Sequence, residues 1–391
     1  MRLLQLYNQY RSGFCGEDIV VRRIADLVGK KGGVTKLLLR DSNEIVGHLG
    51  RKVSAGLFGI YNYRAKAEVK QELQKFQPDI VHAHNLYPLF SPSVLVACRE
   101  LNIPTVMSLH NFNLTCPNAN HLCGTQNCFY CLENSPMGCI TKNCRNNLTE
   151  SMVYALRFYI AQKANLFEKN VDLFISMTKF SKDLLVRGGI QEKKIKVLYN
   201  AVDDKVTPPT HNPKGKYVAF AGRFDRVKGI GVLLEAAKQL KDIPFHLAGG
   251  GPLFDSMQQK AFNNVVFRGR LDKDEMNRFY SDARMLVVPS LWFDMCPLVI
   301  SEGMAFSLPI IASDQGGISE LVTDGKDGLL FTTGNATELA AKIATLWDNR
   351  ELSLNYGKQA RITVEKRFSE EIYYRDLAAI YNEAIGRKVF N

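Results

Sequence analysis

The 391-residue sequence has no run of about 18 uncharged apolar residues, so it offers no transmembrane helix of ordinary length. Its first residues, Met1–Tyr7, also lack the apolar core and cleavage site of a secretory signal, and they indicate a β-strand instead. We therefore expect a cytoplasmic protein. Apolar residues make up 46% of the chain, which is enough to fill the cores of the two domains that its length favours.

Acidic charge is scarce in the first half of the chain. Residues 1–200 contain 26 Lys and Arg against 15 Asp and Glu, a surplus of 11, whereas residues 201–391 contain 24 of each. This surplus predicts contact between the first half and something anionic, such as a lipid leaflet or a phosphorylated acceptor. A solvated basic surface that only aids solubility is the alternative.

The alternation of apolar runs and helical patterns predicts an α/β protein. Residues 1–200 open with a strand, a loop containing Gly16 and a helix, and they form the first predicted domain. A polar, Pro-rich linker lies near the start of the second domain, residues 201–368. Residues 369–391 are expected to form a helix that returns to the first domain.

Two acids flank the start of a predicted helix in the second domain. The apolar strand Met285–Pro289 leads to a loop with Asp294, and Glu302 follows eight residues later inside the helix Pro297–Ala305. In open α/β sheets, ligands bind beyond the carboxyl ends of the strands, where free amides at helix starts donate hydrogen bonds. Taken alone, this spacing is weak evidence for a binding site, and a helix cap with a solvated glutamate is the better explanation.

A glycine-rich turn with two cations lies earlier in the same domain. Arg223 and Lys228 belong to the segment Gly222–Gly229, between a predicted strand and a predicted helix. Arginine can bind two phosphate oxygens at once, and lysine adds a compact positive charge. Either residue alone is consistent with an ordinary surface turn.

Histidines end two predicted strands of the first domain. His82 and His84 alternate with apolar neighbours, so they share one face of a strand. His110 directly follows the strand Pro104–Leu109. We interpret His110 as the main active-site candidate of the first domain, with a merely structural histidine as the alternative.

The segment PSLWFDMCPLVISEGMA resembles the E-x7-E element of retaining glycosyltransferases of the GT4 type, with Asp294 and Glu302 at the two acidic positions. The GR-x4-KG turn is similar to the diphosphate clamp of that family. The resemblance covers nearly the whole chain. It implies the GT-B fold, in which two Rossmann-like domains face a central cleft. It also implies transfer of a sugar from a nucleotide diphosphate to a hydroxyl with retention of configuration.

The resemblance also implies roles for single residues. Glu302 would hold the donor's ribose and Asp294 would contact the donor sugar, helped by the backbone that follows it. The chain departs from the family by having aspartate at the first position and Cys15–Gly16 where a Gly–Gly pair is usual. The residues expected to act in catalysis are His110 and Asp294, and those expected to bind the donor are Gly16, Arg223, Lys228, Met295, Cys296, Pro297, Leu298 and Glu302.

Six of the nine cysteines lie within residues 116–144 and include one C-x2-C pair. Thiolates at such spacing suit a structural zinc ion, and the predicted ligands are Cys116, Cys128, Cys131 and Cys144. Free, partly buried thiols are the alternative. Some relatives have a similar insert, so the chain resembles a cysteine-containing subgroup of surface-polysaccharide glycosyltransferases.

No cofactor is expected in catalysis. The segment Asp272–Asp274 has the D-x-D spacing of metal-dependent sugar transferases, but it precedes a predicted helix and is better explained as a cap.

The function implied by the resemblance is transfer of a sugar to a lipid-linked glycan in surface polysaccharide or lipopolysaccharide biosynthesis. The enzyme would be a hexosyltransferase-type glycosyltransferase at the inner face of the cytoplasmic membrane, and no nucleic-acid partner is expected. A sugar epimerase or a phosphorylase with the same fold is one alternative, although no pyridoxal-phosphate lysine is evident. An inactive scaffold of a polysaccharide-assembly complex is another.

Overall fold

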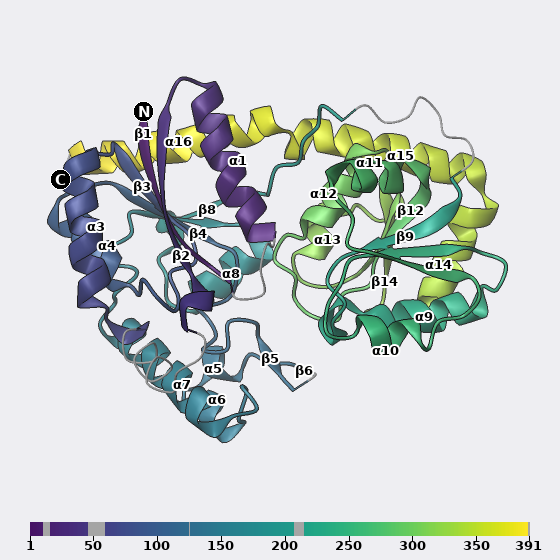
Figure 1. Ribbon diagram of the computed structural model, residues 1–391, viewed down its shortest axis with the longest axis horizontal. Helices are drawn as coiled ribbons and strands as arrows, with labels where there is room; N and C mark the ends of the chain where they lie inside the picture. Colours follow the sequence, from purple (N-terminus) through teal and green to yellow (C-terminus); the bar gives the residue numbers. More distant parts are fainter. Residues whose placement is uncertain (11–15, 46–58, 125, 207–214, 390–391) are drawn as a thin grey trace. The chain divides into compact units, whose positions relative to one another are not determined.

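The computed structural model describes residues 1–10, 16–45, 59–124, 126–206 and 215–389 (Figure 1). The chain divides into two compact units, of which unit 1 comprises Met1–Tyr199 and Tyr374–Asn391 and unit 2 comprises Asn200–Tyr373. Each unit contains a six-stranded parallel sheet. This arrangement confirms the predicted α/β class.

The sheet of unit 1 has the strand order β2-β1-β3-β4-β7-β8. Its helices α3 and α4 lie on one side of the sheet and α1 on the other (Figure 1). The strands are β1 (Arg2–Gln9), β2 (Val34–Asp41), β3 (Ile80–Ala83), β4 (Thr105–Leu109), β7 (Leu173–Ser176) and β8 (Ile195–Val197). The helices between them include α1 (Gly16–Lys30), α3 (Tyr63–Phe76), α4 (Ser93–Glu100) and α8 (Lys179–Arg187).

Parallel strands that are covered on both faces need continuous apolar sequence. Leu3, Leu4 and Leu6 of β1 accordingly have no exposed surface. Polar side chains mark where helices begin. The side chain of Asn62 accepts a hydrogen bond from the Ala65 amide at 3.0 Å and caps α3.

The sheet of unit 2 has the strand order β11-β10-β9-β12-β13-β14. Helices α9, α10 and α14 lie on one side and α11, α12 and α13 on the other (Figure 1). The strands are β9 (Tyr217–Ala221), β10 (Phe245–Ala248), β11 (Val265–Gly269), β12 (Ala283–Val288), β13 (Ile310–Ser313) and β14 (Gly328–Phe331). The helices are α9 (Ile230–Gln239), α10 (Phe254–Gln258), α11 (Lys273–Asp282), α12 (Leu298–Ala305), α13 (Ile318–Leu321), α14 (Ala336–Asp348) and α15 (Arg350–Thr363).

The D-x-D segment caps a helix, as predicted. The Asp272 side chain accepts a hydrogen bond from the Glu275 amide at 2.8 Å, and the Glu275 side chain accepts one from the Asp272 amide at 2.9 Å. This reciprocal pair is a capping box at the start of α11.

Residues between β4 and β7 form the cysteine-containing insert and a longer helix, α7. The insert holds a short antiparallel pair of strands and two single-turn helices. In chain order these elements are β5 (Leu122–Cys123), β6 (Gln126–Asn127), α5 (Tyr130–Glu133), α6 (Gly138–Thr141) and α7 (Leu148–Lys163).

The last helix, α16 (Glu370–Val389), begins in unit 2, and from Tyr374 onward it belongs to unit 1. There the Tyr381 hydroxyl lies 2.7 Å from Nδ1 of His82, and Glu383 pairs with Lys196 at 2.7 Å. Across the described ranges, α16 included, no helix is both long and apolar enough to cross a bilayer.

Candidate active site

Asp294 and Lys228 are in direct contact at the carboxyl ends of two strands of unit 2. The loop after β12 carries Asp294, and the turn after β9 carries Lys228. The lysine Nζ donates hydrogen bonds to both carboxylate oxygens, at 2.9 and 2.7 Å. The Ser290 hydroxyl donates a third, at 2.8 Å, and Asp294 is only 8% exposed. Residues predicted from separate motifs therefore meet in one site.

Backbone packing explains why these two loops approach each other. Gly229 has a φ of +70°, and a Cβ at this position would lie 1.8 Å from the carbonyl oxygen of Pro289. Only glycine allows so close an approach between the two loops. The Asp225 side chain also accepts a hydrogen bond from the Lys228 amide at 3.1 Å and fixes the turn.

Arg223, the second predicted cation, has a different environment. Its side chain is 55% exposed and forms an ion pair with Asp225. An exposed ion pair contributes little free energy, so the guanidinium can exchange this partner for a stronger anion at low cost. The two predicted phosphate ligands thus differ in their own exposure, because the Arg223 side chain is more than half exposed whereas the Lys228 side chain is only 23% exposed; their acidic partners, Asp225 and Asp294, are both largely buried.

Glu302 lies in α12, where the hydroxyl of Tyr280 from α11 donates a hydrogen bond to its Oε2 at 3.0 Å. Burial, followed by the charge of Glu302, holds the pKa of Tyr280 well above 10. The tyrosine therefore stays protonated and orients the carboxylate. The sequence alone gave no signal for Tyr280.

The predicted donor-binding backbone, Met295 to Leu298, leads into α12, whose first residue is Leu298 and whose N-cap is Pro297. The first amides of a helix have no acceptor within it and carry partial positive charge. The Asn200 side chain donates to the Cys296 carbonyl at 3.1 Å and holds this segment in place. Burial raises the pKa of the Cys296 thiol to about 12, so this cysteine is neutral and a poor nucleophile.

Two buried side-chain N–H donors in these loops have no partner among the described residues. They are Nε1 of Trp292, two residues before Asp294, and Nε2 of Gln315, in the loop after β13. Lys228 also lies over the Trp292 ring, 5.6 Å from its centroid. The loops at the carboxyl ends of β12 and β13 therefore retain unused hydrogen-bonding capacity, as expected of a polar binding site.

In unit 1, His110 follows β4 and faces a small pocket that it lines together with His84, Asn85, Asn111 and Asn113. Its Nε2 lies 3.0 Å from Nδ1 of His84. The prediction that His82 and His84 share a strand face is confirmed, since their rings stack at 4.2 Å. Burial lowers the pKa of both His82 and His110 to about 3, so neither carries charge at neutral pH.

Glu17 is a buried acid near this pocket that the sequence reasoning overlooked. It lies in the first turn of α1, next to Gly16, and its Oε1 accepts a hydrogen bond from the Asn85 amide at 3.0 Å. Burial, and to a lesser degree the charge of Asp18, raises the pKa of Glu17 to about 8. Its position after a glycine loop at a helix start was the available signal. Cys15 lies outside the described residues.

Comparisons with known proteins agree with this geometry. Residues 202–363 match the model of the family described as glycosyl transferases group 1, and residues 38–206 match that of glycosyltransferase family 4. The chain belongs to the family 4 glycosyltransferases. It is a retaining glycosyltransferase that uses a nucleotide-sugar donor.

Several relatives of this glycosyltransferase span much of its length. An uncharacterised glycosyltransferase of Methanocaldococcus jannaschii is 28% identical over 78% of this chain and 75% of its own. The sulfoquinovosyl transferase of Arabidopsis thaliana is 26% identical over 75% of this chain but only 55% of its own. These matches do not place the chain in a cysteine-containing subgroup.

Solved structures show the GT-B fold of the glycosyltransferase. Sucrose-phosphate synthase from Thermosynechococcus elongatus superimposes with a TM-score of 0.73 over 99% of both chains, at 18% identity. HepE from Anabaena, in complex with UDP and glucose, superimposes with a TM-score of 0.70 over 98% of this chain and all of its own, at 19% identity.

The predicted zinc site of the glycosyltransferase is not supported. In the ranges that the structure describes, no three His, Cys, Asp or Glu side chains are arranged to hold a metal ion. The Cys128 thiol instead accepts from Lys142 Nζ at 3.8 Å, and the Cys131 thiol donates to the Pro136 carbonyl at 3.8 Å. Burial, and after it the nearby thiols of Cys116, Cys139 and Cys128, raise the pKa of Cys131 to about 12, so this cysteine is a neutral thiol here. Cys116 and Cys144 form no disulfide with any described cysteine.

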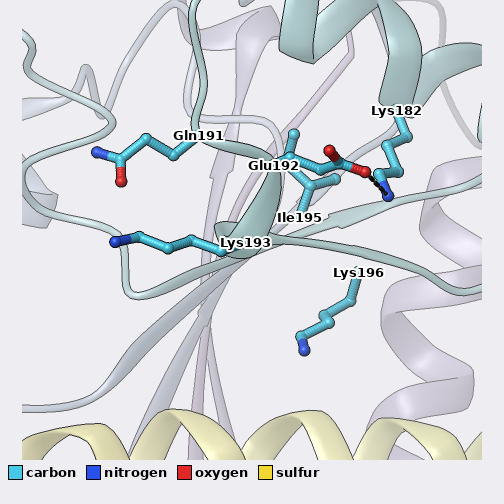
Figure 2. Close-up of a pocket in the computed structure, with 6 residues that line it drawn as sticks. All are labelled: Lys182, Gln191, Glu192, Lys193, Ile195 and Lys196. Carbon is cyan, nitrogen blue, oxygen red and sulfur yellow. Dashed lines mark ion pairs between the residues drawn. The ribbon is translucent and has the colours of Figure 1, made fainter.

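An open hollow on unit 1 is a poor candidate for the active site of the glycosyltransferase (Figure 2). It surrounds a short 3-10 turn, Glu192–Lys194, at the amino end of β8, whereas ligands of such sheets bind at carboxyl ends. Glu192 already pairs there with Lys182 at 2.7 Å. The hollow is lined by Lys182, Gln191, Glu192, Lys193, Ile195 and Lys196.

Proposed function

We propose that this enzyme transfers a sugar from a nucleoside diphosphate to a hydroxyl of a glycan acceptor, and that unit 2 binds the donor. The contact between Lys228 and Asp294 beside the start of α12 carries this proposal. In the proposed reaction the bond between the anomeric carbon and the diphosphate breaks while a bond to the acceptor oxygen forms. The transition state has oxocarbenium character, as in glycoside hydrolysis.

Stabilisation of the leaving diphosphate supplies most of the rate enhancement in this proposal. Lys228, Arg223 and the first amides of α12 are the positive groups available to do it. Asp294, which holds Lys228, contacts the donor sugar. Glu302 binds the ribose hydroxyls, because a carboxylate oriented by Tyr280 can accept two hydrogen bonds from a diol.

The acceptor in this proposal is a glycan of a surface polysaccharide, assembled on a lipid carrier. Two relatives support it by their names, an O-antigen chain mannosyltransferase of Escherichia coli, 30% identical over 40% of this chain, and an amylovoran biosynthesis glycosyltransferase of Erwinia amylovora, 26% identical over 55%. Unit 1 would supply the acceptor side, with His110 orienting the reacting sugar.

A lipid-linked acceptor would bring unit 1 to an anionic membrane surface. One face of α7 carries apolar side chains that are 41–56% exposed at spacings of four, four and three residues, namely Leu148, Met152, Leu156 and Tyr159. The positive surplus of residues 1–200 adds electrostatic attraction to such a surface. Exposed apolar side chains of this kind can enter the headgroup region of a bilayer.

A panel of nucleotide sugars tests the proposed donor site directly. The correct donor should raise the melting temperature, because a ligand that binds only the folded state stabilises it by mass action. Lys228→Ala should abolish the shift, and Lys326→Ala, which removes an exposed lysine of the same unit, should retain it. No shift with any nucleotide sugar would reject the donor site. A shift without transfer or hydrolysis would favour the inactive scaffold, and conversion of the donor to its epimer would favour the epimerase.

A further inference from the structure

A chain of hydrogen bonds that starts at Gln5 determines which nitrogen of His84 carries the hydrogen. Gln5 is fully buried in β1, and its Nε2 donates to the carbonyl oxygen of Val21 at 3.1 Å. Its Oε1 lies 2.9 Å from Nε2 of His84. Exchanging the oxygen and nitrogen of the amide would set two oxygens against each other at Val21. Gln5 must therefore accept, and Nε2 of His84 must donate.

The tautomer of His84 in turn determines the tautomer of His110. Burial holds the pKa of His84 well below 6.5, so its ring is neutral and has one hydrogen, which the contact with Gln5 places on Nε2. Its Nδ1 is then an acceptor, and the group 3.0 Å away, Nε2 of His110, must donate to it. Since His110 is also neutral, its Nδ1 is left with a lone pair.

Ring stacking and hydrogen bonds hold His82, His84 and His110 in fixed orientations. The His84 ring stacks on His82 at a centroid distance of 4.2 Å and on His110 at 5.3 Å. His82 is held at both nitrogens, by Tyr381 and by Ser108, each at 2.7 Å. Turning the His84 ring over would exchange its nitrogens for ring carbons and break its hydrogen bonds to Gln5 and His110.

We propose that Gln5 and His84 are positioning residues that hold His110 as the Nε2–H tautomer, so that its Nδ1 accepts a hydrogen bond from a sugar hydroxyl. This inference rests on the proposed function, in which His110 faces a reacting sugar. Within the described part of the chain, Nδ1 of His110 makes no hydrogen bond, and the residue is partly exposed beside the small pocket. A neutral acceptor at this position binds groups that can donate a hydrogen bond. It recognises a hydroxyl and rejects a phosphate or carboxylate oxygen.

Histidine ring ¹⁵N chemical shifts of the whole protein at pH 7.5 test the tautomer without any substitution. The expected result is a neutral His84 and a neutral His110, both with the hydrogen on Nε2. A His110 that is charged, or that carries its hydrogen on Nδ1, would overturn the proposal. This readout needs no substrate, so it stays informative even if the donor panel rejects the proposed function.

Substitutions of His84 then test the consequence for activity. His84→Leu removes the acceptor of the His110 hydrogen and should lower kcat/KM for transfer 10- to 100-fold, while nucleoside diphosphate binding is unchanged. His84→Asn returns an amide oxygen near the position of Nδ1 and should recover most of the loss. His246→Asn, a matched change in unit 2, should have no effect. Normal kinetics in a folded His84→Leu enzyme, or no recovery in a folded His84→Asn enzyme, would contradict the positioning role.

Discussion

Replacing Asp294 with asparagine removes the charge that Lys228 contacts and leaves the side-chain volume nearly unchanged. In the parent, the lysine makes two short bonds to this carboxylate, and the two side chains are only 23% and 10% exposed. Hydrogen bonds between charged groups contribute about 1.5–3 kcal/mol each, and breaking a fully buried pair costs about 3–5 kcal/mol. Because Lys228 retains some access to water, we expect Asp294→Asn to lower the free energy of unfolding by about 2–3 kcal/mol.

The same substitution should act oppositely on stability and on binding. Lys228, once released, is free to contact a phosphate oxygen, so the affinity for the bare nucleoside diphosphate should stay equal or rise by up to about tenfold, which is about 1.4 kcal/mol. Sugar transfer should be lost, because the carboxylate that contacts the sugar in the proposed reaction is absent. Lys228→Met should instead weaken nucleoside diphosphate binding.

A double-mutant cycle separates these effects. Urea unfolding of the parent, Asp294→Asn, Lys228→Met and the double variant measures the coupling between the two side chains, and titration calorimetry measures nucleoside diphosphate binding by each. A coupling below about 0.5 kcal/mol, within the additivity of independent sites, would refute the reasoning from the contact. An Asp294→Asn enzyme that loses nucleoside diphosphate binding as completely as Lys228→Met would refute the assignment of roles.

Three further predictions concern other parts of the molecule. Arg223→Ala should cost about 2–4 kcal/mol of transition-state stabilisation, the scale of one lost charge-stabilising donor, and near-normal turnover would count against the clamp. Because the pKa of Glu17 is 4.5 in the unfolded chain and about 8 in the folded protein, the folded protein loses stability as the pH rises between these two values. Glu17→Gln removes the ionisable group and should therefore stabilise the protein at pH 8, by at most about 5 kcal/mol at about 1.4 kcal/mol per pH unit. At pH 4 the same substitution should have little effect on stability. Chemical denaturation at pH 4 and pH 8 measures the change in the free energy of unfolding, and an equal change at both pH values would disprove the raised pKa of Glu17. Binding to vesicles should require anionic lipid, weaken with salt and fall in Leu156→Ser, whereas equal binding to neutral vesicles would argue against the membrane surface.

The sequence by itself determined the features that depend on neighbours along the chain. Apolar runs bounded by glycine and polar residues located the strands, and the capping box at Asp272 followed from residue types three positions apart. The apolar pattern around Asp294 and Glu302 correctly placed the first acid in a loop and the second in the helix that follows it. The α/β class and the family were predictable for this reason, since both rest on local order and local chemistry.

Only the tertiary structure decided which distant side chains meet and how much water reaches them. The contact of Lys228 with Asp294 spans 66 residues, and that of Gln5 with His84 spans 79. Neither the pKa of Glu17 nor the neutral histidines can be read from the chain, because burial sets them and burial depends on packing. The cysteines show the same limit, since spacing permits a metal site but only the positions of the sulfur atoms in space could form one.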